Sequence, residues 1–471
     1  MFVDLQMSDE QLKNYALAEI EKILHRNGST LRRFQSMPLP DNIMISEGMN
    51  KLIQEELRYD REQLREENMR FISSFTTEQR GVYDDVMNAV SRGQGGVFFL
   101  YGYGGTGKTF IWRSLSAGIR CKGGIVLTVA SSGIASLLLP GGRTAHSRFA
   151  IPINIYEDSM CNIKPRSSLA ELIGKAELII WDEAPMTNKH CFEALDRSLR
   201  DVLRNSSSSS SLLPFARKVI VFGGDFRQIL PILPKGTRND IVSASLNSSY
   251  LWAHCKVLRL TRNMRLQGGR TESDMQKLRE FSEWILSVGD GTIGDSDDGE
   301  ANIEIPDDLC IKESGNPIAS IVEEIYPYVV DRLSDGKYFE ERTILAPTLE
   351  VVEKVNDFVM SLLPGEEKIY FSSDSISQID GNGEHDTDIY STEYLNSIKL
   401  SGIPNHCLKL KIGVPVMLLR NIDQSSGLCN GTRLVVTRLM THTIEAEIIS
   451  GIYILLVHSF YFNNVIFSSC R

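Results

Sequence analysis

The stretch Gly102-Tyr103-Gly104-Gly105-Thr106-Gly107-Lys108-Thr109 directly follows the apolar run Val97-Phe98-Phe99-Leu100-Tyr101. The spacing of its glycines, lysine and threonine is that of a phosphate-binding loop between a buried strand and a helix start. The glycines allow backbone N–H groups to turn toward a phosphate. Lys108 is expected to reach the β- and γ-phosphates, and Thr109 to hold Mg²⁺. This stretch therefore predicts a domain that binds a nucleoside triphosphate.

Length and composition indicate a folded, multidomain chain. Its 471 residues, 42% of them hydrophobic, suffice for two to four domains with apolar cores. The net charge of −10 argues against a protein that its global charge holds on nucleic acid, although local basic grooves stay possible. The eight cysteines are scattered without a C-x-x-C pair, so neither a disulfide framework nor a zinc site is indicated. A reducing compartment, the cytosol or the nucleus, is expected.

Short apolar runs alternate with helical or irregular stretches through the first half of the chain. Continuously apolar runs such as Leu178-Ile179-Ile180-Trp181 are typical of strands that are buried on both faces of a parallel sheet. The alternation predicts such a sheet, wrapped by helices. Its strands are expected at 97–101, 125–130, 177–181, 218–222 and 256–260.

The remaining segments differ in pattern. Residues 1–75 contain two stretches of helical character, at 8–24 and 47–70. A second α/β segment begins near Leu258 and includes an expected strand at 343–346. From about 393 to 437, short β-runs around the turn dipeptide Asn430-Gly431 predict a small sheet or barrel. The apolar stretch 452–467 is too short and too polar for a membrane helix, so no membrane contact is expected and the stretch is interpreted as foreign to the fold.

Two carboxylates follow the strand expected at 177–181. Asp182 is suited to hold a metal ion through water, and Glu183 to polarise an attacking water molecule. A phosphate loop alone does not separate kinases, GTPases, ATPases and translocases. The carboxylate pair favours hydrolysis over transfer of the phosphoryl group to a hydroxyl.

The next strand ends in Gly223-Gly224-Asp225-Phe226-Arg227-Gln228. The carboxyl ends of parallel strands meet at the ligand crevice of such sheets. Gln228 is a neutral group able to sense the γ-phosphate or its attacking water, while Arg227 and Asp225 are suited to couple this event to a neighbouring surface. Taken alone, the stretch is equally compatible with an ordinary turn closed by glycine.

Together these residues resemble a known family, the petite-integration-frequency (PIF) type DNA helicases of superfamily one, in particular the form found in plant Helitron transposons. The resemblance covers about residues 8–450. It is carried by Thr76–Gln79 (Q motif), Gly102–Thr109 (motif I), Ala130–Ala135 with Arg143–Ser147 (motif Ia), Trp181–Met186 (motif II), Gly224–Gln228 (motif III), Leu260–Arg265 (motif IV), and Leu408–Gly413, Met417–Asn421 and Leu428–Arg433 (2B domain).

The resemblance assigns roles to single residues. Gln79 is expected to read adenine and Arg265 to act as an arginine finger, which completes a catalytic set of Lys108, Asp182, Glu183, Gln228 and Arg265. Tracking along a single strand requires contacts to its backbone and stacking on its bases rather than readout of base edges. The residues expected to contact DNA are Ser131, Ser132, Thr144, His146, Phe149, Arg227, Asn430 and Gly431. Without the resemblance, His146 would be interpreted as an ordinary surface or core histidine.

The resemblance also implies an architecture and an activity. The fold class is α/β, with tandem RecA-like P-loop domains built on parallel sheets flanked by helices. The expected domains are a helical N-terminal segment (1–75), domain 1A (76–255), an incomplete domain 2A (256–392), a β-rich 2B-like subdomain (393–437) and an incomplete end with an apolar tail (438–471). The implied activity is ATP-dependent 5′→3′ unwinding of DNA in repair, recombination and telomere maintenance. ATP and Mg²⁺ are the implied cofactors, single-stranded DNA or single/double-strand junctions the partner, and the nucleus the location; the oligomeric state is left open.

The chain departs from the family near its end. The Ser-Gln-Gly element of motif V and the Ala-Leu-Ser-Arg element of motif VI are not found after Ser450-Gly451. We therefore expect a truncated gene product whose tail comes from intron read-through or a frameshift. One alternative function is a catalytically impaired fragment that binds ATP and single-stranded DNA. A phosphate-loop signalling NTPase is another, and the lack of an Asn-Lys-x-Asp guanine-reading motif counts against it.

Overall fold

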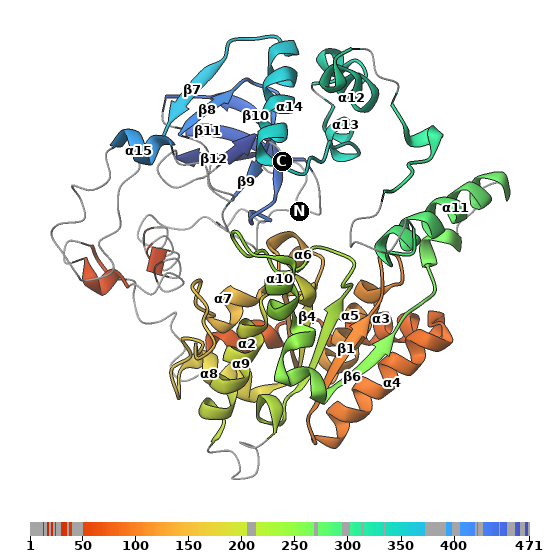
Figure 1. Cartoon of the computed structure of the whole chain (residues 1–471). Helices are drawn as coiled ribbons and strands as arrows, with labels where there is room; N and C mark the ends of the chain where they lie inside the picture. Colours follow the sequence, from red (N-terminus) through yellow and green to blue (C-terminus); the bar gives the residue numbers. More distant parts are fainter. Residues whose placement is uncertain are drawn as a thin grey trace. The chain divides into compact units, whose positions relative to one another are not determined.

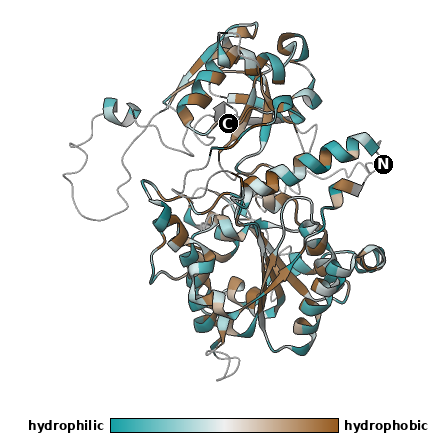
Figure 2. Cartoon of the chain, turned by 45° about the vertical axis from the view of Figure 1, so that its right-hand side comes forward, coloured by the Kyte–Doolittle hydropathy of each residue, from teal (hydrophilic) through white to brown (hydrophobic). Residues whose placement is uncertain are grey.

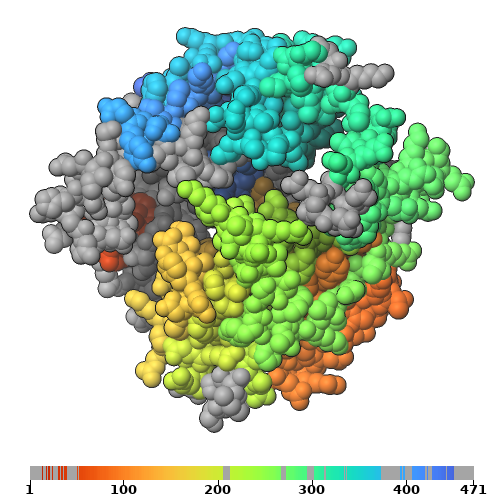
Figure 3. All heavy atoms as spheres, in the orientation of Figure 1, coloured from red at the N-terminus to blue at the C-terminus, as the bar shows by residue number. Residues whose placement is uncertain are grey.

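The computed structural model describes most of the chain, drawn as coloured spheres in Figure 3. The described residues are 13, 17, 20, 21, 24, 30–34, 37–39, 50–204, 213–267, 272–293, 302–311, 315–333, 335–372, 392–397, 406–419, 422, 427–441, 443–449, 457–461 and 467–469. The chain forms two compact units, Met1–Glu55 and Glu56–Arg471.

In the first unit, the described part of the helix predicted at 8–24 is helical; it comprises Lys13, Leu17, Ile20, Glu21 and Leu24. A short 3-10 helix, η1 (Leu31–Arg33), follows. The Glu21 carboxylate accepts hydrogen bonds from the Thr30 hydroxyl (2.6 Å) and from the backbone N–H of Leu31 (2.5 Å). Glu21 therefore anchors the start of η1 to the preceding helix.

The second unit contains a six-stranded parallel sheet (Figure 1). Its strand order is β3-β2-β4-β5-β1-β6. All five predicted strands are confirmed, and the two-residue β3 is added at the edge. The bounds are β1 (Gly96–Tyr101), β2 (Ile125–Ala130), β3 (Arg143–Thr144), β4 (Ala176–Asp182), β5 (Val219–Gly224) and β6 (Cys255–Arg259). β6 pairs with β1 in parallel register, so it belongs to the same sheet; the predicted domain boundary at 255 stays a prediction.

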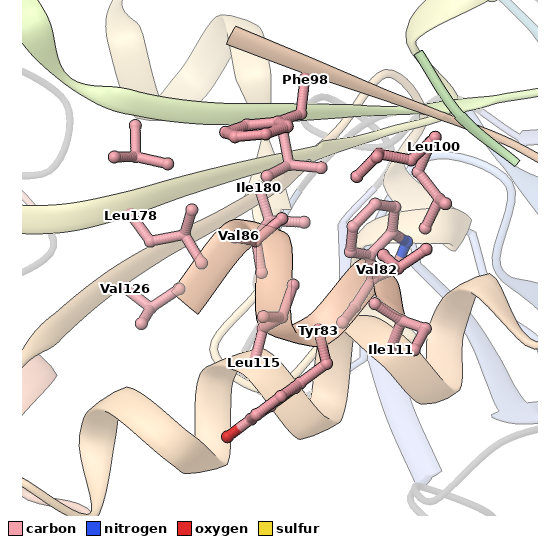
Figure 4. Close-up of a cluster of buried hydrophobic side chains, with 14 of the residues drawn as sticks. Val82, Tyr83, Val86, Phe98, Leu100, Ile111, Leu115, Val126, Leu178 and Ile180 are labelled. Atoms are coloured by element: carbon pink, nitrogen blue, oxygen red, sulfur yellow. The ribbon is translucent and has the colours of Figure 1, made fainter. Parts of the chain in front are cut away.

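Alternating side chains of each strand enter two different cores. Phe98 and Leu100 of β1 pack on one face of the sheet against α4 (Thr77–Arg92) and α5 (Lys108–Arg120), as Figure 4 shows. Phe99 points to the opposite face, where its ring packs against Phe226 and Trp252. On this face Phe192 of α9 (Lys189–Val202) packs against Trp181 in a tilted arrangement and against Phe222 edge to face. The inner strands β1, β2 and β5 are accordingly largely hydrophobic, whereas the edge strand β6 contains Lys256 and Arg259; the helices are hydrophilic on their outer sides (Figure 2).

Capping residues fix where the central helices begin and end. Thr76 and Gln79 form a reciprocal capping box at the start of α4, and Gly93 ends this helix in the left-handed conformation. Asp60 caps α3 by accepting from the N–H groups of Glu62 and Gln63. The other helices around the sheet are α3 (Arg61–Ser74), α6 (Gly133–Leu137), α7 (Ala145–Phe149), α8 (Ser168–Lys175) and α10 (Arg238–Ala244), and α2 (Lys51–Leu57) spans the boundary between the two units.

The described residues after β6 are mainly helical as far as β7 (Lys368–Phe371). The helices are α11 (Glu272–Gly289), α12 (Pro317–Ile325), α13 (Gly336–Glu340) and α14 (Leu349–Leu362). The strand expected at 343–346 is not formed: Leu345 is 82% exposed there, so the apolar run does not enter a core. β7 pairs antiparallel with β8 (Cys407–Leu410), and α15 (Thr392–Ser397) lies between these two strands in the sequence.

A five-stranded antiparallel sheet of order β12-β11-β10-β9-β13 follows, which confirms the predicted change to short β-runs. Alternate residues of β10 and β11, such as Leu434, Val436, Ile444 and Ala446, fill its core. The bounds are β9 (Pro415–Leu418), β10 (Arg433–Leu439), β11 (Thr443–Ile448), β12 (Val457–Tyr461) and β13 (Phe467–Ser469).

The two last strands correct the interpretation of the C-terminal stretch as foreign to the fold. The backbone of β12 pairs with β11, and that of β13 pairs with β9. Valine and aromatic residues favour strands, which explains how these segments extend an existing sheet. No helix among the described residues has both the length and the apolar character needed to span a bilayer.

Candidate active site

The chemistry-bearing residues meet at the carboxyl edge of the parallel sheet. β1 leads into the phosphate loop, β4 ends at Asp182, β5 ends at Gly224, and β6 leads into the loop that begins at Leu260. The carboxyl ends of parallel strands form the ligand crevice of open α/β sheets. The topology therefore brings motifs that lie far apart in the sequence, from the phosphate loop at Gly102 to the loop that begins at Leu260, to one edge of the sheet.

The phosphate loop has the backbone conformation that its glycines predict. Gly105 and Gly107 both have φ of +90°, in the left-handed region that L side chains rarely adopt. The Thr106 hydroxyl donates to the carbonyl of Tyr103 (2.9 Å), which closes the turn. The Lys108 ammonium donates to the carbonyl of Gly102, so it lies folded over the loop. This loop offers backbone amides, a cation and the N-terminus of α5 to a phosphate group.

Gln79 lies against this loop rather than in open solvent. Its side chain is 3% exposed, and its Oε1 accepts from the backbone N–H of Thr76 (3.1 Å). A Cβ added to Gly107 would lie 2.7 Å from Nε2 of Gln79. Glycine at 107 thus permits the close approach between the Q motif and the phosphate loop; the adenine-reading role of Gln79 stays a prediction.

Asp182 fits the expected metal ligand. The residue is 6% exposed, and its Oδ1 atom is buried with no hydrogen-bond partner among the described residues. A buried carboxylate oxygen without a partner costs free energy that a bound cation or its water would recover. Burial raises the pKa of Asp182, while the neighbouring Trp112 side chain and the positive charge of Lys108 oppose this shift. With Thr109 in the first turn of α5, the donor set suits Mg²⁺, which would neutralise phosphate charge when bound.

Glu183 has the environment of a general base. Burial raises the pKa of its carboxyl group, and the neighbouring charge of Asp182 raises it further. Its backbone φ is +54°, which is uncommon for a residue other than glycine. Such strain is typical of functional positions, and here it turns the backbone away from the strand direction directly after Asp182.

The loop after β6 covers the phosphate loop. The backbone N–H of Met264 donates to the carbonyl of Gly105 (2.8 Å), and a Cβ on Gly105 would lie 2.4 Å from Oδ1 of Asn263 and 3.2 Å from Cδ of Arg265. Arg265 therefore lies beside the position that the phosphates would take. Its predicted role as the arginine finger is compatible with this placement and stays a prediction.

Two further contacts hold the same loop. The Glu78 carboxylate accepts from both the N–H (2.9 Å) and the hydroxyl (2.5 Å) of Thr261, and the Tyr103 hydroxyl donates to the Thr261 carbonyl (2.5 Å). Sequence reasoning singled out none of Glu78, Tyr103, Thr261 and Asn263 as individual site residues. All four nevertheless lie within or directly beside the Q motif, motif I and motif IV, which is the signal that could have identified them.

Motif III presents its two polar residues differently. Gln228 is exposed in the loop after β5. Arg227 instead forms an ion pair with Asp290 just beyond α11, with 2.7 Å between Nε and Oδ1, and its guanidinium lies 5.7 Å and 5.8 Å from the ring centroids of Tyr101 and Tyr103. The predicted DNA contact of Arg227 would therefore require exchange of Asp290 for a phosphate.

The hydroxyl residues after β2 are already engaged within the protein. The Ser131 hydroxyl accepts from Trp181 Nε1 (3.1 Å) and from the Thr187 hydroxyl (2.7 Å), and the Ser132 hydroxyl caps α6 by accepting from Ala135 N–H (3.2 Å). These bonds orient the start of α6 at the carboxyl edge. The backbone N–H of Ser131 is engaged as well, since it donates to the carbonyl of Asp182 (3.1 Å).

The helix α7 contains one correction. Phe149 is fully buried, 0% exposed, and stacks on Trp181 with 6.1 Å between ring centroids, so it cannot offer a face to a DNA base. The prediction for Phe149 is wrong because an aromatic residue in a five-residue helix looks the same whether it faces a core or a ligand. Thr144 is 8% exposed at the start of α7, and burial lowers the pKa of His146, favouring its neutral form.

Asn430 and Gly431 lie in the turn that leads into β10. Gly431 has φ of +93°, and its N–H donates to the carbonyl of Leu418 (2.7 Å). Asn430 is exposed. The turn predicted from this dipeptide is confirmed, and its contact with DNA stays a prediction.

Two protein-family models match parts of the chain. The model described as PIF1-like helicase matches residues 74–299, and that described as DNA helicase Pif1, 2B domain, matches residues 393–439. ATP-dependent DNA helicase PIF1 of Danio rerio is 25% identical over 352 residues, 74% of this chain and 45% of that protein. ATP-dependent DNA helicase Pif1 of Psychrobacter sp. is 25% identical over 336 residues, 71% of this chain and 43% of that protein. The chain thus spans less than half the length of these two relatives.

A solved structure supports the fold. The Pif1 helicase from Bacteroides in complex with ADP-AlF3 and ssDNA matches with a TM-score of 0.51 at 21% identity, over 82% of this chain and 74% of that one. The six-stranded parallel sheet carries the phosphate loop and the carboxylate pair within the range of the first family model, and the antiparallel sheet begins within the range of the second. The chain is therefore similar to PIF1-like helicases over residues 74–299 and to the 2B domain of DNA helicase Pif1 over residues 393–439.

Proposed function

We propose that this chain is an ATP-driven motor that translocates 5′→3′ on single-stranded DNA and unwinds duplex DNA. One observation carries the proposal. Lys108, the buried Asp182 with its unpartnered Oδ1, and Glu183 with its raised pKa come together at one sheet edge. This arrangement provides phosphate binding, a metal ligand and a base for water, which are the components of ATP hydrolysis.

The DNA part of the proposal is supported by the relatives. The Bacteroides helicase of the same fold is described with ssDNA and a nucleotide analogue, and the curated relatives are named ATP-dependent DNA helicases. Mg²⁺ as the metal, the nucleus as the location, and roles in DNA repair, recombination and telomere maintenance belong to the same proposal. Its origin in a plant Helitron transposon is a further part, which rests on the resemblance of the motifs.

A second candidate is a protein that binds ATP and single-stranded DNA without coupling them. The observation that favours it concerns the segment between β6 and β8. There the described residues contribute one strand, β7, which pairs antiparallel, and they form no second parallel sheet. Motors of this kind close two domains on ATP, so an incomplete second domain would leave binding intact and impair coupling.

The experiment measures ATP turnover by the full chain with and without single-stranded DNA. DNA-stimulated turnover that Lys108→Ala abolishes supports the motor. Unwinding of a duplex with a 5′ overhang, but not of one with a 3′ overhang, supports the polarity. Binding of ATP and DNA with no stimulated turnover supports the second candidate, and failure to bind ATP contradicts both.

A further inference from the structure

A hollow lies at the edge of the parallel sheet opposite the candidate active site, at the amino ends of its strands. It has a volume of about 340 Å³ and lies where β4 and β5 begin, beside the end of α4. Its lining is largely apolar or small, with Val90, Gly93, Ala176 and Leu203, and it contains the charged residues Glu177, Arg217 and Lys218. A concave site that combines apolar surface with a few convergent polar groups has the form of a small-molecule site.

Lys218 is the chemically distinctive residue of this hollow. Its Nζ donates to the carbonyls of Gly174 (2.6 Å) and Ala176 (2.8 Å), at the junction of α8 and β4. Burial lowers the pKa of Lys218 to about 8, an effect that the charge of Glu177 opposes. A neutral amine has two N–H bonds and one lone pair. The two carbonyls can accept both N–H bonds, which leaves the lone pair of the neutral form unused.

We propose that Lys218 is an acylation site, with the hollow as the place that receives the acyl group. A lysine that is desolvated in an apolar pocket is an effective nucleophile. Its nitrogen attacks the carbonyl carbon of an activated acyl donor, a thioester or an acyl phosphate. The new N–C bond forms, the C–S or C–O bond breaks, and the thiolate or phosphate leaves; the proton lost by nitrogen passes to the leaving group.

Acylation would change the junction between α8 and β4. An amide nitrogen keeps a single N–H, so one of the carbonyls of Gly174 and Ala176 loses its donor. The positive charge near the carboxyl end of α8 is also removed, and this charge is favourable to the helix dipole. The modification would therefore loosen the start of the strand that ends at Asp182.

Other lysines of the chain provide matched controls. Lys175 and Lys256 have side chains that are 56% and 57% exposed, and they pair with Glu171 and Asp85. Lys411 also donates to two backbone carbonyls, those of Met360 (3.0 Å) and Leu363 (2.7 Å), but it does not line this hollow. Lys411 thus separates the effect of the carbonyl contacts from that of the hollow.

The test is site-by-site mass spectrometry of the folded full chain after treatment with acetyl phosphate or, in a second arm, an acetyl thioester. Near pH 8, Lys218 should react at least about tenfold faster than Lys175, Lys256 and Lys411 in one or both arms. Its rate should level off above about pH 8, whereas that of an exposed lysine continues to rise. The chain unfolded in urea should lose the difference, and Lys218→Arg confirms the peptide assignment. The proposal would be overturned if Lys218 reacted no faster than Lys175, Lys256 and Lys411 in either arm. It would also be overturned if Lys218 were labelled faster than these lysines only in urea.

Discussion

The carboxylate of Glu78 accepts two hydrogen bonds from Thr261, one from its backbone N–H and one from its hydroxyl. Glu78 lies in the first turn of α4, beside Gln79, and Thr261 begins the loop that contains Asn263 and Arg265. The contact therefore fixes the loop over the phosphate loop to the helix that starts at the Q motif. The position of Arg265 therefore depends on Glu78, which lies 183 positions before Thr261 in the sequence.

Glu78→Gln should weaken this anchor, because a glutamine side chain has one acceptor oxygen for the two donors of Thr261. We expect turnover of ATP to fall by roughly three- to tenfold as charge-assisted bonds to an exposed group are replaced by neutral ones. Steady-state kinetics measure this effect. Glu62→Gln, which alters an exposed pair with Arg65 on α3, is the control and should leave turnover unchanged. Equal kinetics for Glu78→Gln and the wild type would contradict the anchoring role.

Asp290→Asn should release Arg227. The variant loses the charged partner of Arg227 Nε, so the guanidinium becomes available to a DNA phosphate. We expect affinity for single-stranded DNA to rise about threefold at low salt, with a steeper loss of affinity as salt increases. Fluorescence anisotropy measures both quantities. Asp307→Asn removes the same charge from an exposed site and serves as the control. Arg227→Ala added to Asp290→Asn should cancel the gain; a gain that persists would show that Arg227 is not its source.

The parallel sheet and the phosphate loop could be predicted because their signals are local. Strands buried on both faces must be continuously apolar, as Leu178–Trp181 is, and a phosphate loop needs its glycines at fixed spacing. The contact between Arg227 and Asp290 has no such signal, since 63 residues separate two charged side chains in unrelated patterns.

Two of the predictions were wrong because the sequence does not show whether an apolar residue is buried. Phe149 and Leu345 are both apolar residues in short apolar runs, yet the first is 0% exposed and the second 82% exposed. The difference depends on which elements pack nearby, and that is a property of the tertiary fold. Periodicity in a run of four or five residues does not contain this information.

Glu56→Ala should destabilise the protein strongly. Glu56 pairs with Arg120 (3.4 Å) and with Arg148, and all three side chains are at most 7% exposed. Removing the carboxylate leaves two buried cations without their shared anion, which costs about 3–5 kcal/mol in comparable buried pairs. Urea denaturation measures the free energy of unfolding. Glu62→Ala, which breaks an exposed pair, should cost about 0.5 kcal/mol or less; similar losses for both variants would contradict the role of the buried cluster.

Glu183 should set the acidic limb of the pH profile of ATP turnover. Its carboxyl group acts as a base only when it is ionised, and burial together with the charge of Asp182 raises its pKa above the ordinary value of 4.5. Turnover should therefore fall as pH decreases through a midpoint above 4.5. Asp182→Asn removes the neighbouring negative charge and should lower the pKa of Glu183, so any residual turnover should persist to lower pH than in the wild type.

Glu183→Gln should reduce turnover by about two to four orders of magnitude while ATP binding is retained, as expected for loss of a general base. Measured profiles of kcat against pH, with ATP affinity determined separately, test both statements. A midpoint at or below 4.5, or full turnover by Glu183→Gln, would assign the base to another residue.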